Sequence, residues 1–248
     1  MARNNKRARA HHSNGAKPNS NSNLIAFDDF TPKRSRKKKV EILPRNVSQE
    51  SYIFCIEDYT ITFGVGPAGT GKTLIATLMA IQALKRGEVE KIVITRPAVS
   101  VDEQHGFLPG TLVDKMAPWT RPIFDVFEEY YTPQQIAYMI EDGLIEICPL
   151  AYMRGRTFHN AWIVADEMQN ATPSQMKMVL TRIGQNSRMV VTGDLNQHDR
   201  GYEENGLRDF LERIEHADRE SVAVVHFTKK DVERSTVVTE ILNAYGGS

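Results

Sequence analysis

Eight consecutive residues have the types and the spacing of a loop that binds phosphate groups. In order they are Gly66, Pro67, Ala68, Gly69, Thr70, Gly71, Lys72 and Thr73, which matches the pattern G-x-x-x-x-G-K-[ST]. Glycines let the backbone wrap closely around an anion with its N–H groups pointing inward. Lys72 would then reach the β- and γ-phosphates of a nucleoside triphosphate, and the Thr73 hydroxyl would be a ligand of Mg²⁺. The sequence therefore predicts a site for ATP and Mg²⁺ at this loop.

Two consecutive carboxylates follow an apolar run about ninety residues after the loop. The run spans residues 162–165, and the acids are Asp166 and Glu167. We expect Asp166 to hold Mg²⁺ through water. Because side chains alternate along an extended segment, Glu167 is expected to point away from Asp166 and to act as general base on the attacking water. An Asp-Glu pair alone is usually a solvated strand end, and the upstream loop is what favours catalysis.

A third polar group ends another apolar run. Residues 189–197 finish in Gly193-Asp194-x-x-Gln197, and their neighbours in the sequence place this run beside the acidic one. The pattern resembles the third motif of superfamily 1 helicases. That resemblance implies that Gln197 senses the γ-phosphate and that Asp194 supports it. The alternative is an ordinary polar turn after a strand.

The elements that must position these groups alternate between short apolar runs and stretches with helical periodicity. From about Val40 this alternation predicts an α/β fold, a parallel sheet sandwiched between helices. The expected strands span residues 60–65, 91–95, 144–148, 161–165, 188–192 and 221–226. A helix is expected over residues 71–86, with Gly87 as its stop. Another begins at Thr172 as N-cap, with Pro173 in the first turn and Gln175 completing a capping box.

The first forty residues differ in composition from the rest. Residues 1–39 hold eleven Lys or Arg and two Asp, whereas the remainder holds twenty basic and twenty-nine acidic residues, so the net charge of zero divides into +9 and −9. We expect residues 1–40 to be a disordered basic tail and residues 41–248 to be one domain. The tail is interpreted either as a contact for nucleic-acid phosphates or as a solubilising extension.

The sequence gives no sign of a membrane span or of a disulfide framework. Its apolar runs are far shorter than the ~20 residues that cross a bilayer, and no apolar run follows the basic start as in a signal peptide. The two cysteines, Cys55 and Cys148, lie among apolar neighbours without a paired spacing, which indicates buried thiols. We expect a cytoplasmic protein without membrane partners.

Six segments in this order resemble the PhoH-like family. They are residues 66–73, Thr95-Arg96-Pro97-Ala98-Val99, Gly106-Phe107-Leu108-Pro109-Gly110, Tyr152-Met153-Arg154-Gly155-Arg156-Thr157, Ala165-Asp166-Glu167-Met168-Gln169-Asn170 and Thr192-Gly193-Asp194-Leu195-Asn196-Gln197. The resemblance covers about residues 46–240. It implies a single RecA-like P-loop NTPase domain, an ATPase related to superfamily 1 helicases and found in bacteria and phages. If a phage encodes the protein, the expected location is the host cytoplasm.

The resemblance also implies roles for residues outside the loop. Gln49 would read the adenine edge and Tyr52 would pack near the base, as in the family's Gln-x-x-Tyr. Arg234 would stabilise charge on the γ-phosphate, within the subunit or across an interface. Arg96, Arg154 and Arg156 follow expected strands, where ligand crevices form. For each of these arginines the alternative is a structural ion pair or a solvated side chain.

Superfamily 1 helicases cleave ATP between two RecA-like domains. The sequence predicts only one such domain, so a neighbouring subunit would have to form the second wall of the ATP site. We therefore expect a head-to-tail homo-oligomer, a hexameric ring by analogy with the family. The main hypothesis is an ATPase stimulated by RNA or single-stranded DNA. The alternative is a slow nucleotide-dependent switch or assembly protein that unwinds nothing, which the acidic body favours. A third reading, a nucleotide-binding structural subunit, requires an idle Glu167.

Overall fold

The computed structural model describes residues 39–97, 112–197, 204–233 and 236–244. Several predictions concern residues outside these ranges. These residues are 1–38, which are expected to belong to a disordered tail, Ala98 and Val99, the segment 106–110, and Arg234. For these residues the predictions stay predictions.

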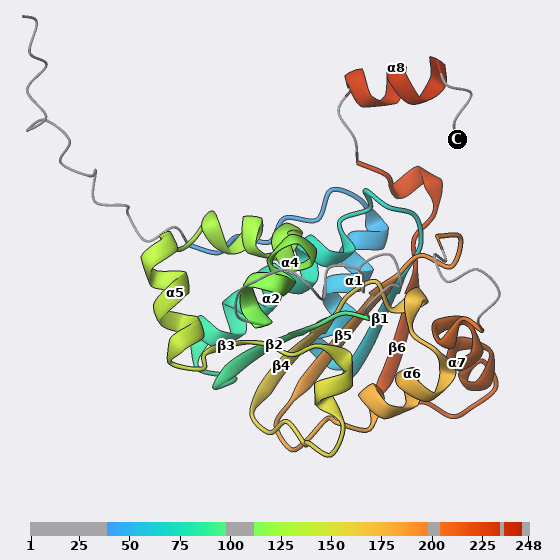
Figure 1. Cartoon of the computed structure of the whole chain (residues 1–248). Helices are drawn as coiled ribbons and strands as arrows, with labels where there is room; N and C mark the ends of the chain where they lie inside the picture. Colours follow the sequence, from blue (N-terminus) through green and yellow to red (C-terminus); the bar gives the residue numbers. More distant parts are fainter. Residues whose placement is uncertain (1–38, 98–111, 198–203, 234–235, 245–248) are drawn as a thin grey trace, which may run out of the picture. The chain divides into compact units, whose positions relative to one another are not determined.

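A six-stranded parallel sheet is the centre of the domain (Figure 1). Its strands are β1 (Ile61–Val65), β2 (Lys91–Thr95), β3 (Ile145–Ile147), β4 (Ala161–Ala165), β5 (Arg188–Gly193) and β6 (Val222–His226). Their order across the sheet is β3-β2-β4-β5-β1-β6. All six expected strands are confirmed, and two of them, β2 and β4, have the expected bounds.

The strands are mostly apolar on both sides because both faces of the sheet are covered. Alternate residues of β2 join different cores: Ile92 and Ile94 lie in one apolar cluster, and Val93 lies in the other. The first cluster contains residues of the helices α1 (Val47–Asp58), α2 (Lys72–Arg86), α4 (Leu112–Glu128) and α5 (Pro133–Glu141). The second contains residues of α6 (Pro173–Leu180) and α7 (Gly206–Ile214). The sheet is therefore sandwiched between two helical layers, as predicted (Figure 1).

The predicted helix ends are confirmed by their hydrogen bonds. Gly87 closes α2 in the left-handed conformation, at φ 71°, and its N–H bonds to Ala83 and Leu84 carbonyls. Thr172 caps α6 by accepting from the N–H of Gln175, whose side chain in turn accepts from the N–H of Thr172. Both devices satisfy backbone groups that a helix end leaves without partners. The two sequence signatures therefore mark the end of α2 and the start of α6 correctly.

Short 3-10 turns and one further helix complete the described part of the chain. The turns are η3 (Leu150–Met153), η4 (Met168–Asn170) and η5 (Lys229–Asp231), and the helix is α8 (Thr236–Ala244). Among the residues that the structure describes, no helix combines the length and the apolar character needed to cross a bilayer.

The strand order decides which chain segments meet. Because all strands are parallel, their carboxyl ends lie at the same edge of the sheet. β1, which leads into the phosphate loop, lies beside β5, and β5 lies beside β4, which ends in the acidic pair. The prediction that the strand before Asp194 neighbours the acidic strand is confirmed. All three polar groups thus converge at one edge.

Gly64 on β1 offers a test of how tightly this strand is held. A Cβ at Gly64 would lie 2.7 Å from Cζ and Oη of Tyr52, a fully buried side chain. We expect Gly64→Ala to lower the free energy of unfolding by about 1–3 kcal/mol, the usual cost of overpacking. Urea denaturation would measure this loss of free energy, and the m-value should not change. In a Tyr52→Leu background the same change should cost less, because the clash is gone; an equal cost in both backgrounds would contradict this account.

Candidate functional site

The phosphate loop connects β1 to α2, and its backbone is held from behind by the segment after β6. Gly66 adopts φ 148°, and a Cβ there would lie 2.3 Å from the carbonyl oxygen of Phe227. The N–H of Phe227 bonds to the carbonyl of Val65, and the N–H of Glu233 bonds to the carbonyl of Gly69. Only glycine fits at residue 66, because both its conformation and its space exclude a side chain.

Lys72 lies inside this loop and is 8% exposed. Its Nζ donates to the carbonyl oxygens of Gly66 and Pro67, both at 2.7 Å, and to Oγ1 of Thr70 at 3.2 Å. Burial lowers the pKa of Lys72, while the carboxylates of Asp194, Glu167 and Asp166 oppose that shift. The loop thus concentrates a cation and a set of backbone N–H groups at the start of α2, as phosphate binding requires.

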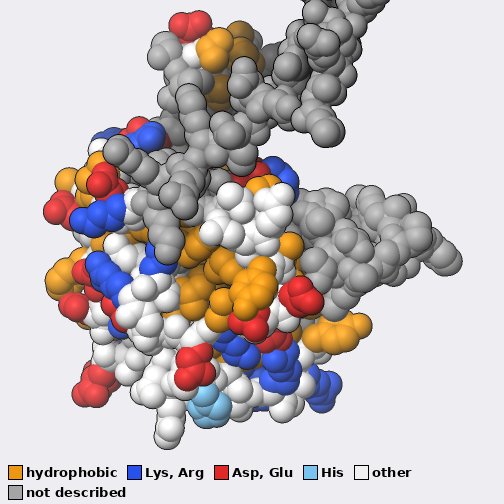
Figure 2. Space-filling model, turned by 90° about the vertical axis from the view of Figure 1, so that its left-hand side faces the viewer, with side chains coloured by type: hydrophobic (Ala, Val, Ile, Leu, Met, Phe, Trp, Pro, Cys, Tyr) orange, Lys and Arg blue, Asp and Glu red, His pale blue; other side chains and the backbone are white. Residues whose placement is uncertain are grey.

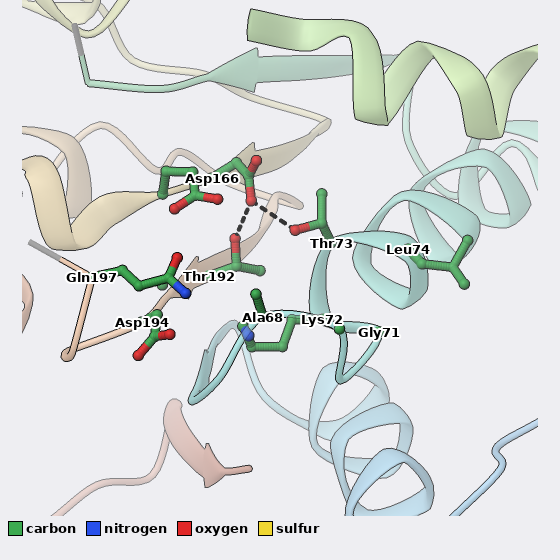
Figure 3. A pocket seen from close by; sticks show the side chains of 12 residues that line it. Ala68, Gly71, Lys72, Thr73, Leu74, Asp166, Thr192, Asp194 and Gln197 are labelled. Carbon is green, nitrogen blue, oxygen red and sulfur yellow. Dashed lines mark hydrogen bonds between the residues drawn. The ribbon is translucent and has the colours of Figure 1, made fainter. Parts of the chain in front are cut away.

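Asp166 joins the loop helix to two strands. Its Oδ1 accepts a hydrogen bond from Oγ1 of Thr73, at 2.8 Å, and another from Oγ1 of Thr192 at the end of β5 (Figure 3). Asp166 is 4% exposed. A carboxylate beside a hydroxyl at a phosphate loop is the oxygen donor set that Mg²⁺ takes together with waters and phosphates. Thr73 and Asp166 therefore fit the predicted metal role.

Glu167 leaves the strand in a way that the sequence did not indicate. It adopts the left-handed conformation, at φ 53° and ψ 38°, which is uncommon for a non-glycine residue. The expectation that strand alternation sets the direction of the Glu167 side chain is thus corrected: a sharp turn of the backbone replaces the alternation, and both carboxylates line the same pocket. The Glu167 carboxylate accepts from Nε2 of Gln169 and lines the same pocket as Lys72.

Gln197 reaches this pocket from a tight turn after β5. The N–H of Gln197 bonds to the carbonyl of Asp194 at 3.1 Å, and Oδ1 of Asp194 accepts from the N–H of Asn196 at 3.0 Å. Asp194 therefore shapes the turn that carries Gln197. Figure 3 shows Gln197 and Asp194 on the side of the pocket opposite Thr73.

These groups surround one hollow of about 250 Å³. Its lining residues are Ala68, Gly69, Gly71, Lys72, Thr73, Leu74, Asp166, Glu167, Thr192, Gly193, Asp194 and Gln197. Nine of these residues were given a role by the sequence: Ala68, Gly69, Gly71, Lys72, Thr73, Asp166, Glu167, Asp194 and Gln197. Gly66, Pro67 and Thr70 support the loop through the contacts to Lys72 instead.

A second hollow of about 650 Å³ adjoins the first and shares Gly69, Gly71 and Leu74 with it. Gln49 lies on its wall and is 4% exposed. Nε2 of Gln49 donates to the carbonyl of Thr70 at 3.0 Å, and Oε1 accepts from the N–H of Arg45 at 2.9 Å. Gln49 thus braces the loop from the side of the second hollow.

Tyr52 lies beneath the strand that leads into the phosphate loop. It is fully buried, it packs edge-on against Phe227, with ring centroids 5.3 Å apart, and its ring fills the space left by Gly64. Burial raises the pKa of its hydroxyl. With no exposed surface, Tyr52 supports the strand before the loop, and its packing near a base stays a prediction.

The arginines of the family segments do not line the first hollow in the described part of the chain. Nη1 of Arg96 donates to the carbonyl of Trp119 at 3.0 Å. Arg156 pairs with Glu146 on β3 and stacks over Phe158, 4.5 Å from the ring centroid. Arg154 is exposed. For Arg156 the structure shows the ion pair that was the alternative, whereas Arg96 is held by a backbone carbonyl, which neither reading expected.

Two residues of the site had no role in the sequence analysis. Thr192 donates to Asp166, and Gln169 contacts Glu167. Thr192 could have been found from the rule that polar residues at the carboxyl ends of parallel strands face the ligand crevice. For Gln169 the sequence offers no comparable signal, because its role depends on the turn at Glu167.

Comparison with known proteins agrees with this geometry. The sequence model of the family described as "PhoH-like protein" matches residues 41–246. A PhoH-like protein of Synechocystis sp. is 46% identical over 198 residues, covering 79% of this chain and 60% of that protein. Protein PhoH of Escherichia coli is 45% identical over 208 residues, covering 82% and 58%.

Two solved structures are similar at a lower level. The SWI2/SNF2 ATPase core of Sulfolobus solfataricus, in complex with dsDNA, has a TM-score of 0.41 and 15% identity, covering 80% of this chain and 48% of that one. The Pif1 helicase of Candida albicans has a TM-score of 0.37 and 11% identity, covering 82% and 44%. These values are too low to carry any functional argument.

The chain spans about three fifths of the length of the first curated relatives that it matches, between 58% and 60% for five of the proteins compared. The family match nevertheless covers the whole described domain, from ahead of α1 to α8. On this evidence the chain belongs to the PhoH-like family.

Proposed function

We propose that this protein binds ATP with Mg²⁺ and hydrolyses it. The observation that carries the proposal is a single pocket in which Lys72, the Thr73–Asp166 pair and Glu167 meet. A cation in a phosphate loop, a metal-binding oxygen pair and a further carboxylate are the parts that triphosphate hydrolysis needs. The adjoining hollow beside Gln49 is proposed to take the adenosine.

Each part has a separate chemical task. Lys72 and the loop N–H groups would hold the β- and γ-phosphates and stabilise charge as the bond to the leaving phosphate breaks. Thr73 directly, and Asp166 through water, would hold Mg²⁺, which when bound neutralises phosphate charge. Glu167 would accept a proton from the attacking water. Gln197 would report the presence of the γ-phosphate from the opposite wall, and Arg234 is proposed as a further source of positive charge there.

Two substitutions separate binding from hydrolysis. Lys72→Ala should weaken binding of a fluorescent ATP analogue with Mg²⁺ by at least about tenfold, because the loop loses its cation. Glu167→Gln should keep that affinity and lower turnover by roughly 10²–10⁴-fold, the range for loss of a general base. Lys177→Ala, at an exposed residue on α6, is the matched control and should change neither value.

Unchanged affinity of Lys72→Ala for the ATP analogue would overturn the proposal that the loop binds the nucleotide. Unchanged turnover in Glu167→Gln would instead favour a structural nucleotide-binding subunit, with the phosphate site intact.

We further propose that RNA or single-stranded DNA stimulates the ATPase. The support is the charge distribution: the basic excess lies in residues 1–39, and the rest of the chain has a net charge of −9. A tail of this kind binds phosphates without sequence preference and releases counterions as it does so. The alternative, a slow nucleotide-dependent switch, needs no such contact.

Steady-state ATPase measurements with poly(U) and with single-stranded DNA test this proposal. Stimulation should be present at low salt and should fall steeply as salt rises, because the contacts are with phosphates. Heparin at matched charge is the control for simple polyanion binding. A rate that no nucleic acid changes at low salt would favour the switch.

We also propose a head-to-tail homo-oligomer, a hexameric ring by analogy with the family. The support is a pair of exposed apolar surfaces. α8 exposes Val237 by 58%, Val238 by 39% and Ile241 by 52%, at spacings that lie on one side of a helix. Figure 2 shows apolar side chains gathered in the middle of the face that carries α5, where a groove of about 440 Å³ is lined by residues including Tyr131, Tyr138 and Met139.

Light scattering after size exclusion measures the assembly. Ile241→Asp should shift the mass toward that of a single chain and should lower the specific ATPase rate, because a charge cannot be buried in an apolar contact. Glu240→Gln, an exposed neighbour on α8, is the control and should leave the mass unchanged. A wild-type chain that is monomeric, with a specific rate that does not fall on dilution, would exclude the oligomer.

A further inference from the structure

We propose that Gln169 is a positioning residue that aims the Glu167 carboxylate and links it to the turn carrying Gln197. This inference rests on the proposed function, because it concerns the group that would act as base. Gln169 belongs to η4 and is 1% exposed. It does not line the phosphate pocket, so it acts through its neighbours.

The side-chain amide of Gln169 bonds to two groups of opposite kind. Its Nε2 donates to Oε2 of Glu167, and its Oε1 accepts from the N–H of Asp194 at 3.1 Å. An ionised carboxylate only accepts hydrogen bonds, and a backbone N–H only donates. The two partners therefore fix which way the amide faces, and only a side chain with both a donor and an acceptor can join them.

The backbone at Glu167 explains why its side chain needs such a link. Its left-handed conformation turns the chain sharply off β4, and Asn170 N–H bonds to the Glu167 carbonyl at 3.1 Å to close that turn. Such a conformation costs free energy and persists only where surrounding contacts determine it. The bond from Gln169 adds the contact that fixes the carboxylate relative to this turn.

The second partner of Gln169 belongs to the other side of the pocket. Asp194 follows Gly193, where a Cβ would lie 2.9 Å from Oε1 of Gln169, so the two segments are in close contact. The Asp194 carbonyl accepts from the N–H of Gln197. One amide thus connects the proposed base with the turn of the proposed γ-phosphate sensor, through hydrogen bonds alone.

A consequence is that the two groups cannot move independently. If the turn at Asp194 shifts when Gln197 meets a γ-phosphate, the amide of Gln169 shifts with it and carries the Glu167 carboxylate along. Hydrolysis would then be favoured only when the triphosphate is in place. This coupling is geometric and needs no change in the phosphate loop.

The substitution Gln169→Glu isolates the link to Glu167. The new carboxylate can still accept from the N–H of Asp194, but it replaces the donor toward Glu167 with a second negative charge. We expect kcat to fall about 10- to 100-fold, since misplacing a base forfeits much of its contribution. Affinity for the fluorescent ATP analogue with Mg²⁺ should stay within about twofold, because the loop and Asp166 are untouched.

The matched control is Gln175→Glu. Gln175 lies six residues further along and uses its side-chain oxygen to complete the capping box of α6, a role that Glu performs equally well. This variant should keep the wild-type kcat and affinity. Thermal melts of both variants would verify that each is folded.

A double-mutant cycle with Glu167→Gln separates positioning from general damage. If Gln169 acts through Glu167, then Gln169→Glu should lower kcat in the wild type and have little further effect once Glu167 is Gln. A folded Gln169→Glu variant with wild-type kcat would overturn the inference, as would an equal loss in both backgrounds. A wild-type protein that does not hydrolyse ATP would overturn the proposed function instead.

Discussion

One carboxylate oxygen joins the three elements on which the site depends. Oδ1 of Asp166, at the end of β4, accepts from Thr73 in the first turn of α2 and from Thr192 at the end of β5. Such charge-assisted bonds in a nearly water-free position are stronger than bonds between neutral groups. They fix the helix that carries Lys72 relative to the strands that carry both proposed acting groups, Glu167 and Gln197. Because these groups lie at the ends of neighbouring strands, the pairing of the strands fixes their positions around the pocket.

The loop itself is held by contacts that involve no catalytic group. Glu233 bonds to Gly69 and Gln49 bonds to Thr70, while Phe227 bonds to Val65 immediately before the loop. Tyr52 fills the space beneath Gly64, one residue before the loop strand ends. A phosphate-binding loop must present its N–H groups in one arrangement, and these backbone contacts supply that arrangement without occupying the pocket.

The sequence predicts the scaffold well because its signals are local. Short, mostly apolar runs mark the six strands, and the capping residues Thr172 and Gln175 mark the start of α6, since both signals depend only on nearby residues. The phosphate loop and the acidic pair are equally local, so the pocket that joins Lys72 to Asp166 was predictable from their order in the chain.

The remaining features depend on side-chain partners that spacing does not reveal. Tyr52 lies on the buried side of α1 because Gly64 leaves room for its ring, a fact about another element. Arg156 contacts Glu146 and Phe158, and only the fold brings these three residues together. Gln169 acquires its partners solely because Glu167 turns into the left-handed region, which no apolar pattern records.

The turn at Glu167 resolves a conflict that a regular strand could not. Asp166 must stay in line with β4 so that its carboxylate meets the hydroxyls of Thr73 and Thr192. If the strand continued, the side chain of the next residue would point to the opposite face of the sheet, toward the apolar cluster that contains Met168 and Val191. A left-handed residue breaks that alternation and lets two adjacent carboxylates serve one pocket. The conformational cost is offset by hydrogen bonds that this turn makes possible, and one of these bonds is the contact between Gln169 and Glu167.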